Sequence, residues 1–152
     1  MIELKDKLTF GAAAGMIANI FKNIFVFGLY FFNIIQYTTW HMASSSYISK
    51  DRINTLGSLI PGAVTDYFMA SIMGIIIMYL LYFTGKEHYI FKGVMVGLFY
   101  WVAIYGIVMS LETTYINPDD LITTLSQIAA HLIIGSLTAF IIVKYGSGLL
   151  EE

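Results

Sequence analysis

The stretch LITTLSQIAAHLIIGSLTAFIIV, residues 121–143, decides the fold class, because it contains no Asp, Glu, Lys or Arg from one end to the other. A helix needs about 20 predominantly apolar residues to cross the hydrocarbon core of a bilayer. Similar charge-free stretches occupy residues 23–41, 67–85 and 93–111. We therefore predict an all-α membrane protein, a bundle of four transmembrane helices.

The composition supports this fold class. Apolar residues make up 58% of the chain and charged residues 12%, against about 45–50% and about 25% in ordinary soluble domains. A soluble chain of this size buries only about 70% of its extended surface, which leaves too few polar groups here to coat the molecule. The net charge of −2 offers no basic surface for nucleic acid, and the absence of cysteine excludes disulfides, thiolate metal sites and thiol catalysis.

Charged and turn-forming residues mark the ends of the spans. We predict a single transmembrane domain, residues 1–152, with spans at about residues 8–37, 59–84, 90–111 and 118–145. Asn117 suits the N-cap of the fourth span, with Pro118 at its first helical position and two aspartates following on the positive end of the helix dipole. Gly146 suits the C′ position of the same helix, and Pro61 an early position of the second span.

The first span has two interpretations. In one, a single helix covers residues 8–37 and Lys22 lies deep in the membrane; in the other, residues 8–21 lie at the interface and Lys22 snorkels from the inner end of a span that begins at Asn23. No proline or other breaker separates the halves, which favours the long helix. The apolar stretch ahead of the alanines at residues 12–14 is too short for a signal peptide, so we expect this segment to stay in the protein.

The distribution of cations predicts the orientation. With four spans, both termini and the middle loop share one side of the membrane. That side holds Lys5, Lys7, Lys86, Lys92 and Lys144. The opposite side holds only Lys50 and Arg52. Because cytoplasmic loops carry the excess of Lys and Arg, we predict that both termini are cytoplasmic.

Small residues predict where helices pack. Gly11 and Gly15 open the first span, and Gly93 and Gly97 open the third with the same spacing. A G-x-x-x-G spacing lets two helix backbones approach closely. Gly135 in the fourth span aligns with Gly74 in the second. These matches suggest a duplicated helical hairpin, like the parallel repeats of some transporters; chance alignment of apolar sequence is the alternative.

Polar groups within the spans form a candidate network, which comprises Lys22, Asp66, His131, Asn19 and Gln127. Lys22 and Asp66 fall at nearly equal depth in a hairpin of the first two spans, so they are either an ion pair or two separate boundary residues. His131 lies near the middle of the fourth span, on one stripe with Gln127. It is either a neutral hydrogen-bonding group or a proton relay.

No motif for catalysis, a cofactor or a metal is present. His41, His88 and His131 fall at three different depths, so they do not form a haem or transition-metal site. The sequence has no P-loop, nucleophile elbow or helical zinc motif. We therefore expect no enzymatic activity and no cofactor.

Two short segments carry a family resemblance. The segments TTLS, residues 123–126, and HLIIG, residues 131–135, together with the glycine-spaced first and third helices, resemble the small four-helix bacterial membrane proteins of the YqhR type. The resemblance covers most of the chain. It implies the same fold and a bacterial cytoplasmic membrane, and it implies no activity.

The sequence is compatible with two functions. The first is a non-enzymatic scaffold or accessory subunit, which packs among membrane lipids against copies of itself or a larger membrane-protein partner. The alternative is a small proton- or ion-coupled transporter or channel that uses polar residues near the midplane. If Lys22, Asp66 and His131 line one water-reachable cavity, the transporter is favoured, and if each is enclosed in a dry bundle, the scaffold is favoured.

Overall fold

The computed structural model describes residues 6–55, 57–111, 114–117 and 119–151, and it is helical without strands over those ranges. Four of the described helices are long and apolar enough to cross a membrane. They are α1 (Lys7–Phe31), α3 (Ile60–Thr84), α4 (Tyr89–Trp101) with its continuation as far as Val108, and α5 (Leu121–Tyr145). Two short helices, α2 (Thr39–Ser44) and α6 (Ser147–Leu150), complete the set. The predicted four long apolar helices are confirmed.

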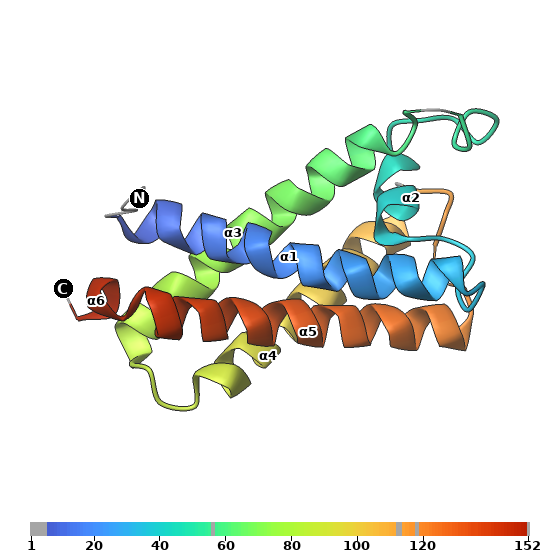
Figure 1. The fold of residues 1–152 in the computed structure, drawn as a ribbon. Coiled ribbons are helices and arrows are strands. Elements are labelled where there is room, and N and C mark those ends of the chain that lie inside the picture. The colour runs from blue at the N-terminus through green and yellow to red at the C-terminus, as the bar shows by residue number, and fades with distance from the viewer. Residues whose placement is uncertain (1–5, 56, 112–113, 118, 152) are drawn as a thin grey trace.

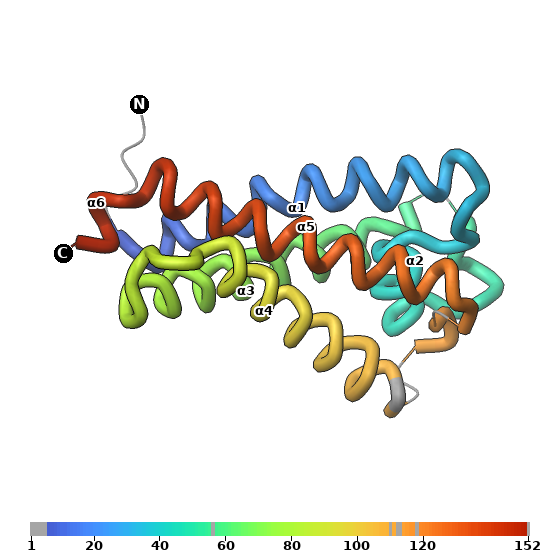
Figure 2. The backbone as a smooth tube through the Cα atoms, turned by 90° about the horizontal axis from the view of Figure 1, so that it is seen from below, coloured from blue at the N-terminus to red at the C-terminus, as the bar shows by residue number. Residues whose placement is uncertain are grey.

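The long helices form two antiparallel hairpins. α1 packs along α3 and α4 packs along α5, while α1 and α5 lie side by side and join the hairpins (Figure 1). The start of α1 and the end of α5 lie at the same end of the bundle. Towards the other end, α4 and its continuation diverge from α5 (Figure 2), and α2 folds back against α3.

Aspartates cap two of the long helices, although one cap differs from the prediction. The Asp6 carboxylate accepts a hydrogen bond from the Thr9 N–H at 2.7 Å, and the Asp120 carboxylate accepts one from the Thr123 N–H at 2.8 Å. The N-cap of α5 is therefore Asp120 and not Asn117, because the carboxylate closer to the helix satisfies its free N–H groups. The predicted position of Pro118 lies outside the described residues. The Thr9 N–H is the main cause that lowers the pKa of Asp6, and the Thr123 side chain followed by its N–H lowers the pKa of Asp120.

Pro61 and Gly146 lie at the two other helix ends for which the sequence made a prediction. Pro61 is the second residue of α3, as predicted. Gly146 was predicted at the C′ position of α5, but it is the C-cap, with φ −113° and its N–H bonded to the Ile142 carbonyl at 2.8 Å. This residue is not left-handed, and the chain turns directly into α6. The backbone conformation therefore does not require glycine here, but packing does, because a Cβ on Gly146 would lie 2.5 Å from the Phe10 ring.

The first span is one continuous helix through Lys22, as the long-helix interpretation predicted, but it ends at Phe31 rather than near residue 37. Asn33 adopts φ +57°, which asparagine tolerates better than most residues. The Ile34 N–H bonds the Leu29 carbonyl at 2.9 Å and the Asn33 N–H bonds the Tyr30 carbonyl at 3.0 Å. These two bonds are those of a Schellman motif, which satisfies the last carbonyls of the helix.

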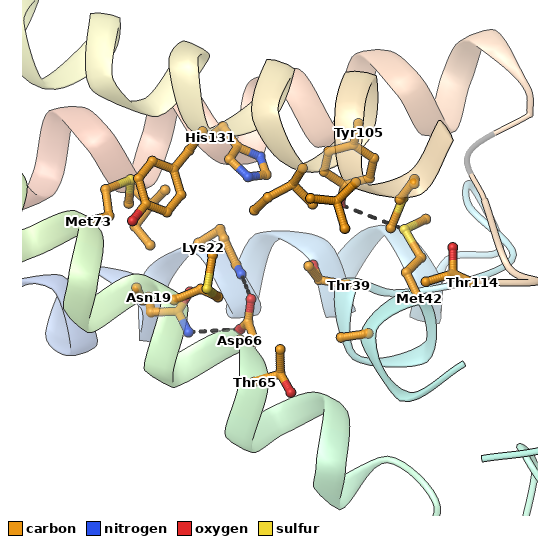
Figure 3. A pocket seen from close by; sticks show the side chains of 18 of the residues that line it. Asn19, Lys22, Thr39, Met42, Thr65, Asp66, Met73, Tyr105, Thr114 and His131 are labelled. Atoms are coloured by element: carbon orange, nitrogen blue, oxygen red, sulfur yellow. Dashed lines mark hydrogen bonds and ion pairs between the residues drawn. The ribbon is translucent and has the colours of Figure 1, made fainter. Parts of the chain in front are cut away.

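The third span changes its helical type halfway. After α4, residues Val102–Val108 form the π-helix η1, and Met109–Leu111 form the 3₁₀ turn η2. A π-helix is wider than an α-helix and is commonly found at functional sites. The segment lies where α4 diverges from α5, and its Tyr105 projects towards His131 (Figure 3).

Glycines allow α1 and α3 to cross in close contact in the first hairpin. A Cβ atom on Gly11 would lie 2.9 Å from the Gly74 carbonyl oxygen, and a Cβ on Gly74 would overlap the Gly11 carbonyl. A Cβ on Gly15 would likewise overlap the Ala70 carbonyl. The two backbones are therefore in direct contact, which only glycine allows.

The second hairpin has a matching crossing. Cβ atoms on Gly93 and Gly135 would each overlap the other residue's carbonyl oxygen, and a Cβ on Gly97 would overlap the His131 carbonyl. Gly93 and Gly97 thus take in α4 the places that Gly11 and Gly15 take in α1. The aligned glycines of the sequence make equivalent contacts, which is what a repeated hairpin requires.

Candidate functional site

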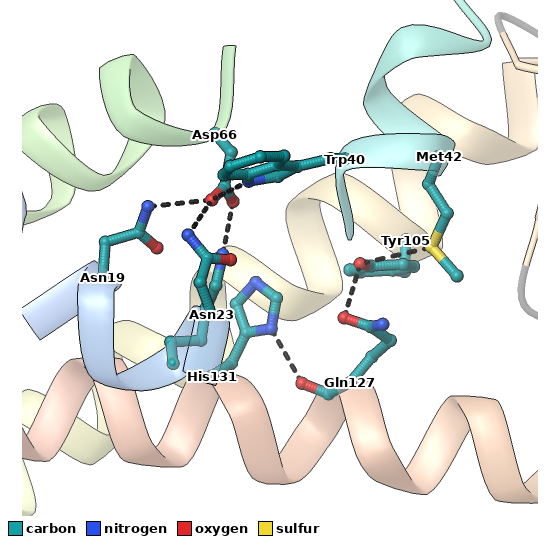
Figure 4. A network of polar contacts seen from close by, with 9 residues as sticks. Asn19, Asn23, Trp40, Met42, Asp66, Tyr105, Gln127 and His131 are labelled. Atoms are coloured by element: carbon teal, nitrogen blue, oxygen red, sulfur yellow. Dashed lines mark hydrogen bonds and ion pairs between the residues drawn. The ribbon is translucent and has the colours of Figure 1, made fainter. Parts of the chain in front are cut away.

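A buried carboxylate, that of Asp66, lies between α1 and α3 in the first hairpin, where Trp40 of α2 also reaches it (Figure 4). The Lys22 ammonium donates to one oxygen of Asp66 as an ion pair. The other oxygen accepts from the Asn19 amide at 2.8 Å, the Asn23 amide at 3.0 Å and the Trp40 indole N–H at 3.2 Å. Lys22 is 3% exposed and Asp66 is 9% exposed. Both oxygens of the carboxylate therefore have donors, and the charge is paired.

The local reason for this cluster is helical spacing. Lys22 and Asn23 stand three and four residues after Asn19, so all three share one face of α1. Asp66 lies just over one turn beyond Pro61 on α3. Lys22 and Asp66 were expected to be either an ion pair or two separate boundary residues, and in the structure they are an ion pair.

Two members of the cluster were not among the predicted network residues. Asn23 had a signal in the sequence, since it stands one turn beyond Asn19. Trp40 had none, because it reaches Asp66 only when α2 folds back over the hairpin. That fold is held by the Gly62 N–H, which donates to the Ser44 hydroxyl at 2.9 Å, and a Cβ on Gly62 would overlap the Trp40 carbonyl.

His131 and Gln127 form a second polar group on α5. The Tyr105 hydroxyl donates to the Gln127 side-chain oxygen at 2.9 Å, and its ring meets the His131 imidazole edge to face at 5.7 Å. The Nδ1 atom of His131 lies 2.8 Å from the Gln127 carbonyl oxygen. Because a carbonyl only accepts, Nδ1 carries the proton, and Nε2 holds the lone pair of the neutral ring.

The two polar groups occupy related places in the two hairpins. The offset from Gly11 to Gly93 also leads from Asn23 to Tyr105, and the offset from Gly74 to Gly135 also leads from Asp66 to Gln127. Both related pairs are hydrogen bonded, at 3.0 Å and 2.9 Å. The repeated backbone crossing is therefore accompanied by a repeated polar contact, with the charge confined to the first hairpin.

A cavity of about 240 Å³ lies between the hairpins. Lys22, Asp66 and His131 all line it, and Figure 3 shows Lys22 between the other two. The remaining lining is mostly apolar and comes from α2, α3, the third span and α5. The full lining is Asn19, Lys22, Thr39, Met42, Ala43, Ser46, Tyr47, Thr65, Asp66, Met69, Ala70, Met73, Tyr100, Ile104, Tyr105, Val108, Met109, Thr114, His131 and Ile134. Since Tyr47 is 63% exposed, the lining extends from the buried charges to the bundle surface.

α2 lies at the end of the bundle away from the termini (Figure 1). The His41 ring nitrogen Nδ1 lies 2.9 Å from the Thr38 hydroxyl, and its ring stands 5.3 Å from the ring of Tyr30. Partial burial lowers the pKa of His41 below its ordinary value. His41 does not line the cavity, and neither does the exposed His88. The three histidines are thus separate, and within the described ranges no group of three or more His, Asp or Glu side chains is placed to hold a metal.

No protein-family model, curated protein or solved structure matches this chain. The resemblance to the YqhR-type proteins therefore stays a prediction.

Proposed function

We propose that this protein is a small proton-coupled carrier that works through the cavity between its two hairpins. The observation that carries the proposal is that Lys22, Asp66 and His131, from three different helices, line one cavity. Ionisable side chains are costly within a membrane and commonly mark ion pathways or proton relays. A purely structural bundle has no need for a charged pair and a histidine at the same cavity.

The scaffold function, which the sequence favoured, loses part of its basis. Its support included the small-residue faces, because such faces let helices of separate chains associate. Here Gly11, Gly15, Gly93, Gly97 and Gly135 are occupied by contacts within the chain. A self-associating scaffold or an accessory subunit of a larger complex remains the second candidate, and it would have to use the lipid-facing aromatic surface instead.

We propose further that the protein lies in a bacterial cytoplasmic membrane with both termini inside. The Lys86 ammonium donates to the Glu151 carboxylate at 2.6 Å, so the middle loop and the C-terminal segment share one end of the bundle. We expect a cysteine placed at the exposed Ser49 to react with a membrane-impermeant thiol reagent on intact cells, and one placed at the exposed Glu87 to be spared. The chain has no cysteine of its own to interfere. Labelling at Glu87 with protection at Ser49 would reverse the orientation.

The carrier proposal is tested by proton flux in reconstituted vesicles that contain a pH-sensitive dye. We expect wild-type protein to dissipate a gradient between mildly acidic and neutral pH faster than protein-free vesicles do. His131→Gln should reduce this flux to the protein-free level, because glutamine keeps hydrogen bonds but takes up no proton near neutral pH. His88→Gln, at an exposed histidine outside the cavity, is the matched control and should keep the wild-type flux.

Two results contradict the carrier. The first is wild-type flux no greater than that of protein-free vesicles. The second is full flux in His131→Gln, which would remove the proposed proton site. Circular dichroism and thermal unfolding of each variant establish that a lost flux does not come from a lost fold.

A further inference from the structure

We propose that the cavity binds a small amphipathic monocarboxylate together with a proton, an inference that rests on the proposed carrier function and names its substrate class. Lys22 holds the carboxylate, and the apolar wall holds the body of the ligand. The assignment follows from which polar groups of the cavity are already occupied and which are left.

The charged acceptor that a cation would need is already neutralised, and the buried lining acceptors that lack a partner within the described chain, Asn19 Oδ1 and Thr39 Oγ1, are uncharged. Asp66 is the carboxylate of the cavity lining, and its oxygens accept from Lys22, Asn19, Asn23 and Trp40. Three of these donors go to Oδ2 and Lys22 goes to Oδ1, so the ion pair already cancels the charge of the carboxylate. A cation bound there would have to replace Lys22 as the counter-charge and would leave a buried ammonium unpaired, at a cost.

Donors, by contrast, remain. The Lys22 ammonium has three N–H groups, and its hydrogen bonds within the described chain go only to Asp66. The Tyr100 hydroxyl also lines the cavity, and it has no hydrogen bond among the residues that the structure describes. The remaining N–H groups of Lys22 favour a ligand that presents acceptors, and the positive charge of Lys22 favours an anionic acceptor.

The rest of the wall and its size describe the body of the ligand. Met69, Met73, Ile104 and Ile134 form apolar wall on three helices. The volume of about 240 Å³ equals that of roughly eight water molecules in the liquid. This space suits a short aliphatic chain or a single ring with one carboxylate.

Charge balance requires the proton. Lys22 and Asp66 neutralise each other, so an added carboxylate leaves one net negative charge in the bundle, which is costly there. The titratable groups that line the cavity are Lys22, Asp66, His131, Tyr47, Tyr100 and Tyr105. Of these, His131 has a free lone pair on Nε2, because its Nδ1–H is bonded to Gln127. One proton taken up by Nε2 restores neutrality, so the loaded cavity holds one carboxylate ligand and one added proton. The proton leaves again when the carboxylate leaves.

The test is calorimetric binding to purified protein in lipid nanodiscs, with empty nanodiscs subtracted. The probes are pentanoate, the neutral pentanamide and the cationic pentylamine. We expect saturable binding of pentanoate at one site, and no saturable binding of the other two. Titration near neutral pH in buffers of different ionisation enthalpy should show uptake of about one proton per pentanoate bound, because the bound carboxylate favours the protonated form of the nearby imidazole.

Three variants locate the site. Lys22→Met should weaken pentanoate binding roughly tenfold to a hundredfold, as expected when a hydrogen bond to a charged group is lost. Tyr100→Phe and Ala43→Leu leave the ion pair intact, so they serve even if Lys22→Met does not fold. We expect the first of these to weaken binding severalfold and the second to block it by filling the cavity. His88→Gln should bind as the wild type does.

Binding of pentylamine or pentanamide as tight as that of pentanoate overturns the assignment, and so does wild-type pentanoate binding in both Tyr100→Phe and Ala43→Leu. The binding result and the proton-flux result can be told apart. Proton flux without pentanoate binding removes only the substrate class. Pentanoate binding without any proton flux removes the carrier and leaves the binding site.

Discussion

Lys22→Met is expected to lower the free energy of unfolding by about 3–5 kcal/mol, because it leaves the Asp66 carboxylate buried without a counter-charge. Asp66→Asn should cost a similar amount, since it strands the Lys22 ammonium, which is 3% exposed. The double variant should cost less than the sum of the two, because neither stranded charge is then left. Neutral hydrogen bonds between membrane helices are worth only about 0.6 kcal/mol on average, so the coupling should stand clear of that level.

The measurement is reversible unfolding in mixed micelles, arranged as a double-mutant cycle. The pair of Lys86 and Glu151 is the control, because it is solvent-exposed and therefore contributes little. Lys86→Met and Glu151→Gln should show almost no coupling. Strictly additive losses at Lys22 and Asp66 would mean that the two side chains do not meet in the membrane.

Gly74→Val should be the most damaging substitution outside the polar cluster. Any Cβ at this position overlaps the Gly11 carbonyl and approaches the Gly15 nitrogen to 2.8 Å. Backbone atoms have no other rotamer to adopt, so α1 and α3 must move apart. Overpacking of this kind costs about 1–3 kcal/mol and sometimes more, and moving the helices apart also disturbs the contact between Lys22 and Asp66, about two helical turns away along α3.

The matched control is Gly28→Ala on α1, where nothing lies within 4 Å of an added Cβ. This change should stabilise the protein by up to about 1 kcal/mol, because alanine favours a helix over glycine. Gly135→Ala, in the related place of the second hairpin, should destabilise like Gly74→Val but less, since alanine is smaller. If Gly28→Ala raises the free energy of unfolding and Gly74→Val lowers it in the same assay, the close contact of α1 with α3 is supported. An unchanged free energy of unfolding in Gly74→Val would refute that contact.

Much of the architecture follows from the sequence alone. Uninterrupted apolar stretches such as residues 121–143 determine long helices, because a backbone surrounded by lipid has to satisfy its hydrogen bonds within each segment. The glycine pairs at 11 and 15 and at 93 and 97 determine where helices touch closely, since a missing side chain marks the contact whatever the partner. The equal depth of Lys22 and Asp66 was also readable, because it depends only on rise per residue in two antiparallel helices.

Other features depend on the tertiary structure. The π-helix at Val102–Val108 leaves no mark on apolar periodicity. Trp40 reaches Asp66 only because α2 folds back against α3. The path of the segment that connects α1 to α2 leaves no periodic pattern in the sequence. The cavity is the clearest case. Lys22 and Asp66 meet within the first hairpin, but His131 lines the same cavity only because of how the two hairpins are placed against each other. Side-chain packing between the hairpins decides that placement, and spacing within each helix does not.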